Sequence, residues 1–528
     1  MTRTNRLPRI AGALLLAIAF AAGIWFRFAG LARLPFWLDE AYSAYAADHG
    51  WYFLWHVVPT YETHPPFYYS LLHFWRGLFG DGTLALRIPG ALCGVATIGA
   101  AAFAGRALAA ALALRPHQRH WLVCAMAGLV ALHPDLIAMS RDVRPYPVMA
   151  LVYGAALIPL MRIAGARPAL PHRPLAAYAL CEALMLWLHS LGPLFAGAMG
   201  MALLAVIEMR RLDRRDWAWL AGSQVAAILV WLPAALILRD QAPTWIASTW
   251  LVFRPATLWQ SLGLLYAAPP LRARWLGLLL ALFGLALLVC DRRGRRIGFA
   301  LGLLAIVPTA ASLAITLAVS PVFLTRTLSA VALPALLVMT RGLALPGRMR
   351  FAMLLPLAAL LWPMATVDRA ILHAPPNEDW YGTIRWLAAR ARPGDELWAY
   401  PNESALPFVY AARDLGFGIS IRAIPTIVPS IGARGMLPTG SRGVVSLYPD
   451  DIARLAASPQ AQAPCTIWLL RTGPWTYDKG DAMLNALSRR REDVGDWEAE
   501  PIEIAGLRRA GGCPPSVPGR LAAAPATR

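Results

Sequence analysis

Long apolar runs dominate this 528-residue chain and constrain its fold more than any other feature. Hydrophobic residues make up 58% of the sequence and charged residues only 15%, a balance that is not typical of a water-soluble domain. Because a helix needs about 20 residues to cross about 30 Å of hydrocarbon, the chain holds roughly eleven candidate spans. They lie near 10–28, 88–105, 121–139, 147–161, 175–190, 193–208, 217–238, 274–290, 297–319, 327–340 and 351–367. The sequence therefore predicts an α-helical polytopic membrane protein.

The arginines of this chain gather in alternate connections between the candidate spans. A net charge of +19 would suggest nucleic acid in a soluble protein, but here the charge follows the topology, so no nucleic-acid partner is expected. By the positive-inside rule the arginine-rich connections face the cytoplasm. They contain Arg3, Arg6, Arg9, Arg106, Arg115, Arg119, Arg162, Arg167, Arg173, Arg210, Arg211, Arg214, Arg215, Arg292, Arg293, Arg295, Arg296, Arg341, Arg348 and Arg350. The other connections, and the chain after residue 368, then face the opposite compartment.

That opposite compartment is expected to be the bacterial periplasm. Lys479 is the only lysine, and such heavy use of Arg, Ala, Leu and Pro is typical of a GC-rich bacterial gene. The first apolar run continues to Phe28, past the Ala19-Phe20-Ala21 tripeptide, which favours an uncleaved anchor over a signal peptide. The predicted location is therefore the bacterial inner membrane, with membrane lipids around the spans and the C-terminal region in the periplasm.

The composition changes near residue 368 and predicts three regions. Residues 1–367 form a transmembrane domain with a long outer loop at 29–87, residues 368–512 form a periplasmic α/β domain, and residues 513–528 form a disordered tail. Within the second region, 396–400 and 466–470 are predicted as buried strands, whereas 380–390 and 483–490 have the spacing of helices.

The six cysteines divide by their place in the chain. Cys465 and Cys513 both lie in the exported region, where the compartment permits a disulfide between them. The other four lie in or beside the candidate spans and are expected to behave as small hydrophobic residues; they are Cys93, Cys124, Cys181 and Cys290. No cysteine or histidine group has the spacing of a zinc site, so a structural metal is not expected.

The outer loop at 29–87 carries the polar groups that most favour chemistry. Asp39 and Glu40 lie just beyond the first span, and carboxylates beside a bilayer usually mark a substrate path, a proton relay or a catalytic group. The alternative is that the pair caps a short loop helix. His64 stands before Pro65-Pro66, where the backbone cannot continue as a regular helix. A lone histidine at an interface is usually structural, but beside two prolines and opposite an acid this one is a candidate to contact a phosphate or a metal. The many aromatic residues of the loop are typical of a membrane-interface belt.

Two further outer connections carry arginines against the positive-inside trend. Arg141 and Arg144 lie in the segment 140–146, which ends at Tyr146, and Arg326 lies in the segment 321–326. Outward-facing arginines either extend to lipid headgroups or bind an anion. Guanidinium groups suit a phosphate at the membrane boundary, because they are permanently charged and donate two parallel hydrogen bonds.

These residues resemble the GT-C superfamily of polytopic glycosyltransferases, in particular the bacterial members of glycosyltransferase family 39, which are grouped with protein O-mannosyltransferases and the aminoarabinose transferase of lipid A. The resemblance covers most of the chain. It rests on four motifs in order along one topological face, which are Phe36-Trp37-Leu38-Asp39-Glu40-Ala41-Tyr42, His64-Pro65-Pro66-Phe67-Tyr68-Tyr69, Leu86-Arg87-Ile88-Pro89 and Ser140 to Tyr146. The chain departs from the family where Thr327 follows Arg326 in place of Tyr, and where His64 stands in place of a Lys found in some relatives.

The resemblance implies an enzyme that moves a sugar from a polyprenyl-phosphate donor to a lipid, glycan or protein acceptor on the periplasmic face, with inversion. It makes Asp39 the general base and gives Glu40 a supporting role. The donor phosphate would be bound by the cationic and phenolic groups of the outer connections, which are His64, Arg141, Arg144, Tyr146 and Arg326. No cofactor is certain, and a divalent metal bridging Asp39 or Glu40 to the donor phosphate stays open.

The main alternative from another class is a lipid or solute transporter or flippase, because many spans with polar groups also describe alternating access. The sequence favours the enzyme over this alternative. It shows no clear internal repeat, and its polar groups converge on the outer loops instead of the membrane midplane. A nonenzymatic subunit of a membrane assembly is a third hypothesis.

Overall fold

The computed structural model describes residues 7–62, 64–166, 170–248, 251–267, 271–347, 349–430, 433–436, 444–511 and 513. The chain divides into two compact units. The first comprises Met1–Leu31, Arg87–Leu238 and Thr249–Ala374, and the second comprises Ala32–Leu86, Arg239–Ser248 and Pro375–Arg528. The outer loop therefore belongs to the same unit as the C-terminal region, although residues 87–374 lie between them along the chain.

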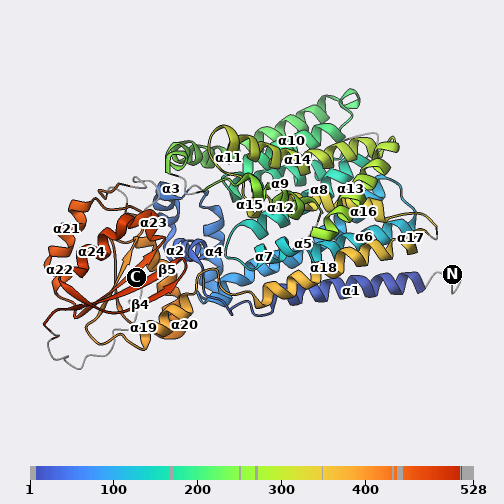
Figure 1. Ribbon diagram of the computed structural model, residues 1–528. Helices are drawn as coiled ribbons and strands as arrows, with labels where there is room; N and C mark the ends of the chain where they lie inside the picture. Colours follow the sequence, from blue (N-terminus) through green and yellow to red (C-terminus); the bar gives the residue numbers. More distant parts are fainter. Residues whose placement is uncertain are drawn as a thin grey trace. The chain divides into compact units, whose positions relative to one another are not determined.

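The first unit is a bundle of long apolar helices (Figure 1). Its helices are α1 (Leu7–Phe28), α5 (Thr83–Ala111), α6 (Pro116–Ala131), α7 (Pro134–Ser140), α8 (Tyr146–Gly165), α9 (His172–Leu188), α10 (Gly192–Val206), η3 (Met209–Arg211), α11 (Arg214–Ser248), α12 (Pro255–Ala267), α13 (Leu271–Cys290), α14 (Gly294–Ala318), α15 (Thr325–Leu328), η4 (Ser329–Val331), α16 (Ala332–Leu343), α17 (Met349–Ala352) and α18 (Leu354–His373). The last residues of α11 and the first of α5 belong to the second unit.

Each apolar run predicted from the sequence falls on helix. Within the described ranges, six helices are long and apolar enough to cross a membrane, and a seventh span results if α6 and α7, which are bent by 56° at their junction, count as one. Two shorter apolar helices, Ala17–Phe28 and Gly192–Val206, add to these. The structure thus confirms a mostly helical, multi-pass architecture, whereas the count of roughly eleven spans stays a prediction.

Close backbone approach and buried hydrogen bonds hold the bundle together. Helices α13 and α16 meet at small residues, because a Cβ added to Gly342 would lie 2.7 Å from the carbonyl oxygen of Leu280. Arg27, near the end of α1, is fully buried and donates to the carbonyl oxygens of Ala131 at 2.9 Å and Val130 at 3.3 Å. These bonds join α1 to the last turn of α6, where the bend before α7 leaves carbonyl groups without helical partners.

The second unit is built on a five-stranded sheet of order β2-β1-β3-β5-β4 (Figure 1). The strands are β1 (Glu396–Tyr400), β2 (Ser420–Ala423), β3 (Thr466–Thr472), β4 (Arg491–Ala499) and β5 (Ile502–Arg509). β1 pairs parallel with β2 and β3, whereas β5 runs antiparallel to β3 and β4. Helices of this region are α19 (Trp380–Ala388), η5 (Asn402–Ser404), α20 (Ala405–Leu415), α21 (Pro449–Ala457), α22 (Pro459–Gln462), α23 (Pro474–Tyr477), η6 (Lys479–Asp481) and α24 (Ala482–Ser488).

The two faces of this sheet are covered by different helices. On β1, Leu397 and Ala399 pack into a core with α19 and α20, whereas Trp398 and Tyr400 pack into a second core with α21 and α24. This alternation follows from the two-residue period of a strand. The predicted α/β region is therefore confirmed, as are both predicted strands and both predicted helices. The disulfide between Cys465 and Cys513 is also confirmed, whereas residues 514–528 of the predicted tail lie outside the described residues.

The outer loop adds four helical segments to this unit, which are α2 (Leu38–Asp48), η2 (Phe53–Val57), α3 (Val58–Tyr61) and α4 (Phe67–Phe79). Helix α2 packs on both α4 and α20. The rings of Phe36 and Tyr410 meet edge to face with centroids 5.7 Å apart, and Tyr410 donates to Asp48 at 2.9 Å. The loop is therefore fixed to the α/β region by both apolar and polar contacts.

Candidate active site

Asp39 and Glu40 lie on the first turn of α2, which begins at Leu38. Carboxylates are favoured there because the helix dipole is positive at its N-terminus. Glu40 is fully buried, and its Oε2 accepts the backbone N–H of Trp37 at 3.4 Å, which closes the helix end as a cap. Asp39 is half-buried. Two adjacent acids thus occupy different environments on one turn.

A third carboxylate reaches the same helix end from a distant part of the chain. Oε2 of Glu378 accepts the backbone N–H of Leu38 at 3.0 Å and the indole N–H of Trp380 at 2.7 Å. Burial above all, together with the charges of Asp39 and Glu403, raises the pKa of Glu378 to about 7 against the opposing effect of the two hydrogen bonds. Glu378 therefore both fixes the start of α2 and carries a proton more readily than an exposed glutamate does.

Glu403, in η5, is a fourth acid of this region. Its side chain is 7% exposed and its Oε2 accepts the hydroxyl of Tyr42 at 2.8 Å. The Tyr42 ring lies 6.4 Å from that of Tyr61, whose pKa is raised by burial and by the charge of Glu62. We call Asp39, Glu378 and Glu403 the acidic cluster, because their charges interact. Among the residues that the structure describes, no three acidic, histidine or cysteine side chains are arranged to hold a metal ion.

His64 also lies in the second unit, between α3 and α4. Its side chain is half-buried, and its backbone N–H donates to Oε1 of Glu62 at 3.3 Å. Pro65 and Pro66 follow, and α4 begins directly after them at Phe67, as the ring geometry of proline favours at a helix start. The proposed phosphate role of His64 stays a prediction.

Arg141, in the first unit, caps the C-terminal end of α1. Its guanidinium donates to the carbonyl oxygens of Phe26 and Ala29, both at 2.9 Å, and to that of Gly30 at 3.1 Å. These are carbonyl groups that have no partner further along the helix. This structural role accounts for an arginine at this position, and binding of a phosphate by Arg141 stays a prediction.

Arg144 and Tyr146 lie three and five residues further on, near a histidine from another connection. The guanidinium carbon of Arg144 lies 6.0 Å from the ring centroid of Tyr146, and that ring lies 5.9 Å from the imidazole of His189. All three residues are buried. Nδ1 of His189 accepts the backbone N–H of Leu191 at 3.0 Å, which favours a neutral ring protonated at Nε2. We call Arg144, Tyr146 and His189 the Arg144 cluster.

Arg326 is half-buried on α15, directly before η4. Segment η4 packs against both α7 and α8, the helices that flank the connection carrying Arg144. Two predicted phosphate-binding segments of the first unit thus lie on neighbouring elements.

Glu378, Glu403 and His189 are the three members of the clusters that sequence analysis did not find. Residues 375–379 stood out only as a break in the apolar pattern, and the segment 189–193 only as a short connection. For Glu378 the single available signal is an acid just before the predicted helix at 380–390. Nothing in the sequence pairs it with Leu38, because that contact spans 340 residues.

No protein-family model and no curated protein sequence matches this chain. Solved structures do match, and they show that the chain has the fold of the GT-C glycosyltransferases. The assignment made from the loop motifs is therefore confirmed at the level of the fold.

The chain is similar to ArnT from Cupriavidus metallidurans over 94% of its own length and 97% of that protein. The apo structure of ArnT gives a TM-score of 0.57 at 14% identity, and the structure bound to undecaprenyl phosphate gives 0.56 at 15%. The oligosaccharyltransferase of Archaeoglobus fulgidus gives 0.51 at 12%, over 94% of this chain and 73% of that one.

Proposed function

We propose that this protein is a membrane glycosyltransferase that moves a sugar from a polyprenyl-phosphate donor to a lipid, glycan or protein acceptor, with inversion at the anomeric carbon. The observation that carries the proposal is the placement of Asp39 at the start of a helix fixed by Glu378 and Glu40, in a chain with the GT-C fold. The ArnT structure bound to undecaprenyl phosphate supports a lipid-phosphate donor.

Asp39 acts as the general base in this proposal. Its carboxylate takes the proton of the acceptor hydroxyl while that oxygen attacks the anomeric carbon, and the polyprenyl phosphate departs from the opposite face of the sugar. Glu40 is less suited to this role, because it is fully buried and caps its own helix. Glu378 and Glu403 are engaged by hydrogen bonds from Trp380 and Tyr42. Glu378 is a positioning residue, since it contacts the backbone of Leu38, next to Asp39.

The negative charge of the departing phosphate needs cations. Arg144 and Arg326 supply permanent charge, Tyr146 supplies a hydroxyl, and His64 and Arg141 are further proposed contacts. A guanidinium buried to 5% exposure, as at Arg144, interacts with an anion more strongly than one in water. A divalent ion is the alternative source of positive charge, and the protein's carboxylates at Asp39 or Glu40 would hold it.

The proposed location is the bacterial inner membrane with roughly eleven spans, the acidic cluster in the periplasm and the arginine-rich connections in the cytoplasm. The direction follows from the positive-inside rule, because the connections before α6, after α10 and before α14 carry the arginines. The runner-up function is transport of a lipid or solute, for which the same spans would serve.

The deciding experiment is sugar transfer by the purified full-length protein, supplied with a panel of polyprenyl-phosphate sugars and membrane-derived acceptors. We expect Asp39→Asn to lower the rate by about 10²- to 10⁴-fold, the usual contribution of a general base. Asp450→Asn, which removes the same charge from the exposed first turn of α21, is the matched control and should keep full activity. Full activity of Asp39→Asn would remove the base assignment, and specific donor binding without turnover would favour transport.

A further inference from the structure

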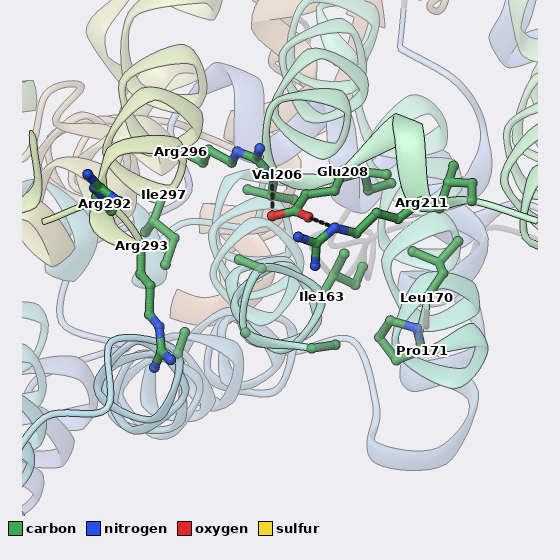
Figure 2. A pocket seen from close by; sticks show the side chains of 16 residues that line it. Ile163, Leu170, Pro171, Val206, Glu208, Arg211, Arg292, Arg293, Arg296 and Ile297 are labelled. Atoms are coloured by element: carbon green, nitrogen blue, oxygen red, sulfur yellow. Dashed lines mark ion pairs between the residues drawn. The ribbon is translucent and has the colours of Figure 1, made fainter. Parts of the chain in front are cut away.

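A polar cavity lies within the helical unit. It has a volume of about 210 Å³ and opens where the last turns of α8 and α10 meet the first turns of α14 (Figure 2). Its walls combine apolar side chains with four arginines and a single acid. The residues that shape it include Ile163, Leu170, Val206, Ile297, Glu208, Arg211, Arg292, Arg293 and Arg296.

Glu208 forms ion pairs with two of these arginines. Its Oε2 lies 2.5 Å from Nε of Arg211, and its Oε1 lies 2.9 Å from Nη1 of Arg296. Figure 2 shows the two guanidinium groups reaching this carboxylate from different directions. Each arginine uses only part of its donors in this bridge, because a guanidinium carries five N–H groups. The bridge therefore holds two cations in place and leaves donors available for another anion.

The walls of the cavity carry a net charge of +3, because four arginines face one glutamate. Arg292 and Arg293 precede α14, and the backbone N–H of Arg293 is held by Oδ1 of Asp291 at 3.0 Å. The first turn of a 25-residue helix adds the positive end of its dipole to the same place. This concentration of positive charge beside apolar walls suits an anion that is attached to a hydrocarbon chain.

An adjoining cavity of about 570 Å³ repeats this pattern. It shares the wall formed by Ala111, Gly165 and Ala166 with the first cavity. Arg106 and Arg162 line it beside Phe103 and Met161, and the Phe103 ring is exposed on the apolar surface of α5. Two neighbouring cavities thus each combine several guanidinium groups with an apolar wall.

We propose that the two cavities together bind the headgroup of an anionic phospholipid that carries two phosphodiester groups, with one phosphate in each cavity and the acyl chains along α5. Forked guanidinium donors match the oxygens of a phosphodiester, and basic pockets between membrane helices recognise such headgroups. The site is independent of the proposed transfer reaction. It lies at the arginine-rich end of the bundle, the end predicted to be cytoplasmic.

The test is lipid binding by the full-length protein in detergent, measured with fluorescent cardiolipin, phosphatidylglycerol and phosphatidylcholine. We expect cardiolipin to bind more tightly than phosphatidylglycerol, and phosphatidylcholine to bind weakly. The double substitution Arg293→Gln with Arg296→Gln should weaken cardiolipin binding by roughly 25-fold, since each arginine near a lipid phosphate contributes about fivefold. Arg210→Gln with Arg295→Gln removes the same charge from neighbouring arginines that do not line either cavity, and should change binding less than twofold.

Two further measurements keep the result unambiguous. The single substitution Arg292→Gln leaves the Glu208 bridge intact, so weaker cardiolipin binding in this variant supports the site even if the double variant folds poorly. Competition by inorganic phosphate at low millimolar concentration would instead indicate a free-phosphate site and overturn the lipid assignment. Equal loss in the test and control double variants, or stronger binding of undecaprenyl phosphate than of cardiolipin, would also overturn it.

Discussion

Asp39 and Glu40 are neighbours on one helical turn, but they differ in burial and in the role of the carboxylate. The carboxylate of Glu40 turns back to the Trp37 backbone, whereas Glu378 comes from 340 residues away to accept the Leu38 N–H. Asp39 lies between them and is only half-buried. The base role proposed for Asp39 needs such partial access together with a fixed backbone, and the two glutamates fix the backbone at the start of α2.

The raised pKa of Glu378 makes a pH dependence of stability testable. Its pKa rises from 4.5 to about 7 in the folded protein because of burial, so the folded state favours the protonated acid. The stability that this proton contributes is complete below pH 4.5 and is lost as the pH rises through about 7. Each pH unit in that window is worth up to about 1.4 kcal/mol, so the loss is on the order of 3 kcal/mol.

We therefore expect Glu378→Gln to remove this dependence, because the amide oxygen still accepts the Leu38 N–H and carries no titrating proton. The measurement is the apparent Tm of wild type and variant from pH 4.5 to pH 8, with Asp450→Asn as a control that keeps the wild-type profile. A difference between wild type and Glu378→Gln that stays constant across this range would contradict the assignment. Glu378→Ala should in addition lower kcat more than it raises KM, since the start of α2 loses a hydrogen bond that positions Asp39.

At the scale of elements, the C-terminal end of α2 is paired with cationic side chains from two other helices. Asp48 ends this helix, where the dipole disfavours an anion, and its side chain is only 5% exposed. Nε of Arg76 on α4 lies 2.6 Å from its Oδ1, and Arg413 on α20 lies 4.0 Å from its Oδ2. The ion pairs therefore join three helices that come from opposite ends of the chain.

Removing Arg76 should cost stability, because it leaves a buried carboxylate without its nearest cation. We expect Arg76→Ala to lower the free energy of unfolding by about 3 kcal/mol, and Arg76→Lys to lower it less. Arg239→Ala is the control, since Arg239 pairs with Asp240 in an exposed position where the pair contributes about 0–1 kcal/mol. Thermal unfolding followed by tryptophan fluorescence would give both values, and equal shifts for the two alanine variants would contradict the prediction.

The disulfide joins the residue just before β3 to the chain after β5. Cys465 precedes β3 and Cys513 follows β5, at a sequence separation of 48. Closing a loop of that length in the unfolded state is worth about 4 kcal/mol. We expect reductant to lower the apparent Tm of the wild type to that of the Cys465→Ser, Cys513→Ser double variant and to leave the variant unchanged. If complete reduction of the disulfide left the apparent Tm of the wild type unchanged, the bridge would contribute little to stability.

The sequence predicted elements wherever a local period was strong. The strand at 396–400 alternates between two cores, and the helices at 380–390 and 483–490 have a single apolar face, so each could be placed within a few residues. The Asp39 motif also stood out locally. The partners of α2 could not be predicted, because Glu378, Tyr410 and Arg413 reach it through contacts more than 300 residues apart in the chain.

The arginines of the predicted outer connections show a second limit of prediction from the sequence. Arg141 and Arg144 are equivalent in the sequence pattern, yet one caps α1 through backbone carbonyls and the other lies beside Tyr146 and His189. Charge and position alone cannot separate an arginine that caps a helix from one that lies beside an aromatic ring. Only the arrangement of neighbouring helices makes that distinction, because it decides which acceptors lie within reach of each guanidinium.

At the scale of the whole molecule, parts of the two units are predicted to face opposite sides of the membrane. One labelling experiment can test this prediction. The positive-inside rule places the arginine-rich connection between α13 and α14 in the cytoplasm and the α/β region in the periplasm. Cys290 is a free, exposed thiol at the end of α13, next to Arg292 and Arg293. Trp475 on α23 is 61% exposed and offers a matching site for a cysteine in the second unit.

We expect a membrane-impermeant maleimide to label Trp475→Cys in intact spheroplasts and Cys290 only in inverted membrane vesicles. Cys290→Ser in the same background reports labelling of the buried or half-buried thiols Cys93, Cys124 and Cys181, which should be slight. The reverse pattern would invert the topology and move the acidic cluster to the cytoplasm, where a donor exposed on the periplasmic face could not be used. The proposed arrangement requires an odd number of membrane crossings between Cys290 and residue 475. Labelling of both sites from one side would mean an even number of crossings and would contradict it.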